Sequence, residues 1–157
     1  MSLVVDIHKR LGDFRLDVAF EAENGVTCLL GPSGCGKSYT LKCIAGIERP
    51  DSGRIELDGR ILFDSAQKID LPPQKRQVGY LFQNYALFPN MTVAQNIRCG
   101  LHHEKDKAER EKRLREIIRR MRLEGLEKHR PYQLSGGQAQ RVALARIMVS
   151  EPKLLML

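Results

Sequence analysis

The stretch GPSGCGKS, Gly31 to Ser38, decides the fold of this chain. It fits the pattern G-x-x-x-x-G-K-[ST] at every fixed position, after the apolar run VTCLL and before a segment with helical periodicity. Glycines let such a loop curl around phosphates, and backbone N–H groups at the helix N-terminus then attract the anion. Lys37 would place a cation on the terminal phosphates, and the Ser38 hydroxyl would ligate Mg²⁺. The loop therefore predicts nucleotide binding and leaves the reaction open among kinases, GTPases and ATPases.

The segments on either side of this loop predict an α/β domain with a helical insertion. Antiparallel strands come first, then a strand, the loop and a helix, then a mostly helical middle, and finally a helix and a strand. The expected strands are residues 3–9, 13–20, 26–30, 54–57, 60–63, 78–82 and 153–157, and the expected helices are 36–45, 105–122 and 136–149. Residues 71–73 are expected to be a stiff connector, and residues 86–100 a loop with a short helix.

Composition agrees with one globular domain of a cytosolic protein. The chain has 157 residues, of which 42% are hydrophobic and 29% charged. Its apolar runs are too short to cross a bilayer, and its N-terminus lacks the apolar stretch of a signal peptide. The four cysteines form no CxxC pair, so reduced thiols are expected.

The net charge of +7 raises the question of nucleic-acid binding. Most of the excess lies in residues 105–122, which also carry an apolar stripe at Leu114, Ile117, Ile118 and Met121. This pattern is typical of an amphipathic helix with a solvated basic face, ended by the glycine at position 125. No aromatic residues alternate with the charges and no nucleic-acid module is recognisable, so no nucleic-acid partner is expected.

A second glycine motif, LSGGQ at Leu134 to Gln138, stands just before the helix expected over 136–149. Ser135 is a good N-cap residue, and two glycines expose the backbone where the helix begins. On physical grounds this is a second candidate anion site. Without the first motif, an ordinary capped helix would be the preferred interpretation.

Together the two motifs resemble the ATP-binding cassette (ABC) family, and the resemblance covers essentially the whole chain. GPSGCGKS matches the Walker A loop, Gln83 in GYLFQNYALFP matches the Q-loop glutamine, LSGGQ matches the signature, and LLML matches the start of the Walker B strand. The resemblance implies a P-loop NTPase (RecA-like) core with N-terminal antiparallel strands and a helical insertion, and with the C-terminal strands missing. Residues 1–157 would form one incomplete domain. Its parts would be the core 1–85, the helical subdomain 86–133, and the signature helix with the Walker B start 134–157.

The resemblance also implies a site that holds ATP and Mg²⁺. Phosphate contacts would come from Gly31, Pro32, Ser33, Gly34, Cys35, Gly36, Lys37 and Ser38. The signature residues Ser135, Gly136, Gly137 and Gln138 would contact the ATP held by a second subunit. Ser38 and Gln83 would ligate Mg²⁺. Phe14 is the candidate for stacking on adenine, and a core residue of the first hairpin is the equal alternative.

By this resemblance the chain is the energy-coupling subunit of an ABC importer, on the cytoplasmic face of the membrane. Its partners would be a second ABC ATPase subunit, arranged head to tail, and transmembrane permease subunits. Residues 71–97 resemble importer subunits for oxyanions, sugars and polyamines, and residues 9–20 favour an oxyanion such as molybdate or sulfate. The alternatives are a soluble ABC-type ATPase acting on nucleic acid or the ribosome, and a nucleotide-binding module without catalysis.

The chain departs from the family pattern at Leu157. In the family the Walker B run continues into an aspartate and a glutamate, which orient Mg²⁺ and activate water. A complete catalytic set is therefore not expected in these 157 residues, which should hydrolyse ATP negligibly and are interpreted as a piece of a longer protein. The family strand between 26–30 and 153–157 would also be missing, so the family's sheet is not expected to hold as a stable monomer.

Overall fold

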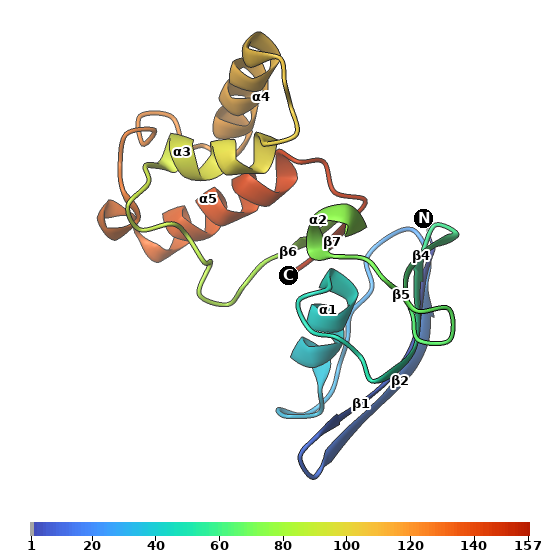
Figure 1. Ribbon diagram of the computed structural model, residues 1–157. Helices are drawn as coiled ribbons and strands as arrows, with labels where there is room; N and C mark the ends of the chain where they lie inside the picture. The colour runs from blue at the N-terminus through green and yellow to red at the C-terminus, as the bar shows by residue number, and fades with distance from the viewer. Residues whose placement is uncertain (1) are drawn as a thin grey trace. The chain divides into compact units, whose positions relative to one another are not determined.

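The computed structural model describes residues 2–157, which form two compact units: residues 2–78 and residues 79–157. The first contains a five-stranded sheet, and the second contains most of the helices (Figure 1). The sheet strands are β1 (Leu3–Leu11), β2 (Phe14–Ala22), β3 (Ser52–Leu57), β4 (Arg60–Asp64) and β5 (Ile69–Asp70), with helices α1 (Lys37–Ala45) and α2 (Pro73–Arg76) in the same unit. The other elements are β6 (Val78–Tyr80), α3 (Val93–Arg98), η1 (Cys99–Leu101), α4 (Lys107–Arg120), η2 (Pro131–Gln133), α5 (Gly136–Met148) and β7 (Leu154–Met156).

The sheet of the first unit is antiparallel, in the order β2-β1-β3-β4-β5. Leu3, Val5 and Ile7 alternate along β1 and are buried, as the period of two in a strand requires. Asp58 and Gly59 connect β3 to β4 with φ angles of 51° and 75°, the left-handed pair of a tight hairpin. The antiparallel first pair and this hairpin were both predicted from the sequence and are confirmed.

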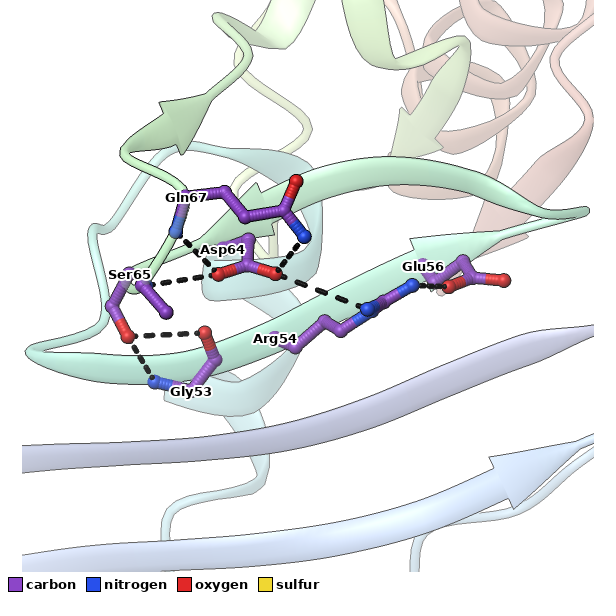
Figure 2. A network of polar contacts seen from close by, with 7 residues as sticks. Gly53, Arg54, Glu56, Asp64, Ser65 and Gln67 are labelled. Atoms are coloured by element: carbon purple, nitrogen blue, oxygen red, sulfur yellow. Dashed lines mark hydrogen bonds and ion pairs between the residues drawn. The ribbon is translucent and has the colours of Figure 1, made fainter.

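A buried carboxylate, Asp64, organises the turn between β4 and β5. Its oxygens accept from the backbone N–H groups of Ala66 and Gln67, both at 2.9 Å, and from the Gln67 amide at 3.2 Å. Beside it, the Ser65 hydroxyl accepts from the Gly53 backbone N–H at 3.0 Å (Figure 2). These partners satisfy the buried groups, so Asp64 has a structural role.

Arg76 is the largest fully buried side chain of the first unit, and the sequence reading missed it. It lies on α2, a short helix that begins at Pro73, the last residue of the connector expected at 71–73. Its guanidinium donates to the carbonyls of Cys43 at 2.7 Å and Ile44 at 3.0 Å, at the end of α1. A side chain on Gly46 would lie within 2.5 Å of Arg76 Nε, so the glycine makes room for this contact. Burial lowers the pKa of Arg76.

The second unit has a helical core. The apolar stripe predicted for the basic helix is confirmed, because Leu114, Ile117 and Ile118 are buried against α3 and α5. The predicted helix end is wrong, however: α4 ends at Arg120, and Arg122 takes the left-handed conformation with φ 53°. The glycine at position 125 therefore follows the end of the helix instead of causing it.

The strand expected over residues 26–30 is also wrong. These residues lie outside every strand in the described part of the chain, and Val26 and Leu30 are 94% and 91% exposed. An apolar run becomes a buried strand only where other strands pair with it on both sides. The last strand, β7, instead pairs with β6, and the Leu81 N–H donates to the Met156 carbonyl at 2.9 Å.

Candidate nucleotide-binding site

The phosphate loop leads into α1 through left-handed glycines. Gly34 and Gly36 have φ angles of 83° and 98°, a region that other residues enter only with strain. Helix α1 begins at Lys37, and within the described chain no side chain caps it. The first N–H groups of the helix are thus left to an outside acceptor, on an exposed loop.

Lys37 folds back over the loop that precedes it. Its Nζ atom donates to the carbonyls of Gly31 at 2.7 Å and Pro32 at 2.8 Å, and lies 3.6 Å from the Cys35 sulfur. The cation is therefore held at the loop beside the free helix N-terminus. An uncapped helix end and an adjacent ammonium on a solvent-exposed loop fit the phosphates of a nucleotide.

Close packing brings Phe14 to this loop. A Cβ atom on Gly36 would lie 2.4 Å from Leu16 Cδ1 and 3.4 Å from Phe14 Cζ, so the start of β2 lies against the end of the loop. Phe14 is 38% exposed, whereas Leu16, two residues on, is buried. The ring is thus available at the phosphate loop, which supports the adenine-stacking interpretation over the core alternative. Adenine stacking stays a prediction.

Gln83 lies at the tip of a tight turn in the second unit. The turn is closed by the Tyr85 N–H, which donates to the Phe82 carbonyl at 2.9 Å, and Gln83 is exposed. Tyr85 and Ala86 then take left-handed φ angles of 60° and 43°. For residues other than glycine this conformation costs about 1–2 kcal/mol each, so other contacts must hold it.

Two polar side chains that the sequence did not single out hold this segment, Arg146 at the left-handed residues and Asn96 at Phe88 beyond them. Arg146 of α5 donates to the Ala86 carbonyl at 2.8 Å and the Tyr85 carbonyl at 3.0 Å. Asn96 of α3 is fully buried; it accepts from the Phe88 N–H at 2.9 Å and donates to the Phe88 carbonyl at 3.2 Å. The available signal was a polar residue between apolar positions of a helix, such as Arg146, the second arginine in RVALARIM.

The signature motif forms a capped helix start. The Ser135 hydroxyl accepts from the Gln138 N–H at 3.3 Å, and the Gln138 side chain accepts from the Ser135 N–H at 2.8 Å. Gly136 and Gly137 have open space where a side chain would be, within the described chain. Packing inside the chain therefore does not require these glycines, which weaken a helix relative to alanine.

An open groove of about 400 Å³ lies beside the Gln83 turn, within the second unit. Two large apolar side chains of its lining are partly exposed, Phe82 at 37% and Phe88 at 45%. The groove is lined by Phe82, Ala86, Phe88, Cys99, Gly100, His102, Arg146 and Ser150. An apolar hollow of this kind is suited to another protein segment.

The family model described as ABC transporter matches residues 16–157, and so covers the phosphate loop, the Gln83 turn and the signature. The chain belongs to the ABC transporter family. It is 28% identical to a solved dimeric ATP-binding cassette in a post-hydrolysis state bound to ADP and Pi, with a TM-score of 0.79 over 99% of this chain and 72% of that one. The predicted fold class is thereby confirmed.

Several curated relatives of this chain are named import ATP-binding proteins. The chain is 44% identical over 155 residues to the molybdenum import ATP-binding protein ModC of Paramagnetospirillum magneticum, which covers 99% of this chain and 42% of that relative. It is 50% identical over 151 residues to the spermidine/putrescine import ATP-binding protein PotA of Methylococcus capsulatus. That match covers 96% of this chain and 37% of that relative. Other relatives are named for import of sulfate/thiosulfate and molybdate/tungstate. The chain thus spans about two fifths of the length of ModC.

Proposed function

We propose that this chain is the ATP-binding part of the energy-coupling subunit of an ABC importer. The observation that carries the proposal is the uncapped start of α1 beside the Lys37 ammonium. Together they provide backbone donors and a cation for the β- and γ-phosphates. Phe14, exposed beside the loop, is the proposed contact for the adenine ring.

We further propose that Ser38 and Gln83 are ligands of the Mg²⁺ ion that accompanies the nucleotide. Both side chains are exposed and carry an oxygen, the ligand type that Mg²⁺ prefers. When bound, Mg²⁺ offsets the negative charge of the phosphates. The chain's own contribution is to present these oxygens from a helix start and from a tight turn.

A second ABC ATPase subunit is the proposed partner of the signature motif. Gly136 and Gly137 leave room around the backbone of α5 that nothing in the described chain uses. Another molecule can therefore approach this helix end, whose N–H groups favour an anion. The solved cassette that this chain resembles is dimeric and holds ADP and Pi, which supports a nucleotide shared between two subunits.

Permease subunits are the proposed occupants of the apolar groove beside the Gln83 turn. The partly exposed rings of Phe82 and Phe88 would be covered by such a segment. No helix among residues 2–157 combines the length and the apolar character needed to cross a bilayer. The proposed contact with the permease would place the chain at the cytoplasmic face of the membrane.

An oxyanion such as molybdate or sulfate is the proposed solute, supported by relatives named for import of molybdenum, sulfate/thiosulfate and molybdate/tungstate. The relative named for spermidine and putrescine, which are cations, is of comparable identity. Because relatives named for solutes of opposite charge are similarly identical to this chain, we expect residues outside this segment to recognise the solute. Transport assays on cells that lack the gene, with molybdate, sulfate and spermidine in parallel, would decide among the three.

The nucleotide site is tested by calorimetric titration of the chain with MgATP. Lys37→Ala is expected to weaken binding by about 10–100-fold, the worth of hydrogen bonds to a charged group. Lys42→Ala is the matched control, since Lys42 lies on the same helix, one turn farther from the loop, and contacts the ring of Tyr39. Equal affinity of the Lys37→Ala variant and the unchanged chain would refute the site.

A further inference from the structure

Arg146 bonds the most strained part of the turn that carries Gln83. The turn closes at Tyr85, and both Tyr85 and Ala86 are left-handed. The Arg146 guanidinium donates to the carbonyl of each of these two residues, at 3.0 and 2.8 Å. We propose that Arg146 is a positioning residue for Gln83: it holds the turn in this conformation and ties it to α5, the helix that begins at the signature.

Arg146 makes the two contacts with two separate nitrogens, Nη1 to the Ala86 carbonyl and Nη2 to the Tyr85 carbonyl. A lysine would have to reach both carbonyls from one nitrogen, without the fixed planar fork that sets the direction of each hydrogen bond. The guanidinium carbon also lies 5.2 Å from the centre of the Phe88 ring, which fixes its orientation. Burial lowers the pKa of Arg146, but an arginine stays charged and keeps its donors.

Other contacts hold the segment on both sides of the turn. Upstream, the Leu81 N–H donates a hydrogen bond to the Met156 carbonyl. Downstream, the Asn96 side chain accepts from the Phe88 N–H and donates to the Phe88 carbonyl. Between these two anchors, Arg146 is the side chain that bonds the backbone of Tyr85 and Ala86. Arg146 therefore links α5 directly to the left-handed residues that follow Gln83. This role rests on the proposed function, in which Gln83 meets the metal ion of the nucleotide.

The decisive experiment measures amide hydrogen exchange in the full chain without nucleotide. Arg146→Lys is expected to speed exchange of the Tyr85 amide about tenfold, the factor produced by losing one hydrogen bond to a charged group. The Phe88 amide, held by Asn96, should keep its rate and serves as the internal reference. Arg141→Lys is the matched control: Arg141 lies on the same helix, and its Nε atom has no hydrogen-bond partner among the described residues.

Ala86→Gly provides the rescue. Glycine adopts a left-handed φ without strain, so the turn should keep its conformation with less help from the guanidinium. In this background the effect of Arg146→Lys on the Tyr85 amide is expected to shrink. Unchanged Tyr85 exchange in Arg146→Lys overturns the proposal, as do additive effects in the double variant. Faster exchange of every amide in Arg146→Lys, including the amides of α5, would indicate a general structural role and would also overturn the proposal.

Titration with ATP, with and without Mg²⁺, separates this inference from the proposed function. Arg146→Lys should weaken binding about tenfold only when Mg²⁺ is present, as expected for a residue that orients a metal ligand. Equal losses with and without the metal would count against the role of Arg146. Failure of the unchanged chain to bind ATP would refute the proposed function alone, because the exchange experiment requires no nucleotide.

Discussion

Phe14 shows at the scale of one residue what a sequence can and cannot decide. From alternation in a strand, a core ring and a ligand-contacting ring look alike. The structure separates them by exposure and by the contact with Gly36 at the phosphate loop.

If the ring stacks on adenine, Phe14→Ala should weaken ATP binding about tenfold, since stacking a base on an aromatic side chain is worth about 1–3 kcal/mol. Tripolyphosphate, which has no base, should bind the variant and the unchanged chain equally, and Phe14→Trp should keep the ATP affinity. A matching loss for tripolyphosphate would show that the ring only supports the loop.

The cysteines differ sharply in their surroundings, which gives a second prediction at this scale. Cys35 is exposed in the phosphate loop, with the Lys37 ammonium 3.6 Å from its sulfur, and protein thiols react fastest in such places. Cys43 is fully buried, and burial raises the pKa of its thiol to about 11. Alkylation followed by mass spectrometry should therefore modify Cys35 before Cys28 and Cys99, and Cys43 last. Bound MgATP should protect Cys35, and early modification of Cys43 would contradict this order.

At the scale of elements, the signature helix gives an opposed pair of glycine substitutions. Gly137→Ala places a methyl group in open space at the start of α5 and should raise the free energy of unfolding by roughly 0.5–1 kcal/mol. In the same unit, a Cβ on Gly100 would lie 2.1 Å from the Arg146 carbonyl, so Gly100→Ala should lower it. Thermal melts of the two variants test this contrast. If the glycine serves a partner, Gly137→Ala should also lose any ATP-dependent dimer seen by light scattering, in spite of its higher stability.

Elements with their own local signal were the ones predicted correctly. The Asp58-Gly59 hairpin follows from turn chemistry, and α4 follows from its apolar stripe. The helix start at Ser135 follows from its capping residues. The strand expected over 26–30 failed because a buried strand depends on neighbours elsewhere in the chain. The hydrogen bonds made by Arg76, Arg146 and Asn96 were not predicted, for the same reason. The partners of a buried polar side chain are brought to it only by the fold.

At the scale of the whole molecule, a substitution of Arg76 can test whether the two compact units, which are divided after Val78, unfold independently. This side chain bonds the carbonyls of Cys43, Ile44 and Leu71 within the first unit. Arg76→Met leaves them unpaired and should destabilise that unit by about 3 kcal/mol, a large share of a typical net stability of about 5–15 kcal/mol. Hydrogen exchange should accelerate in residues 2–78 and stay unchanged in the helical core of 79–157. Equal acceleration in both units would show that they unfold as one, and Arg60→Met, at an exposed position, is the control.

Residues 26–30 have a consequence for handling the molecule. VTCLL is rich in strand-forming side chains, carries no charge or proline, and lies uncovered between an acidic stretch and the phosphate loop. Such a segment is a template for cross-β stacking between copies of the chain. Concentrated solutions should therefore precipitate by intermolecular strand pairing at this point, while each copy keeps its folded units.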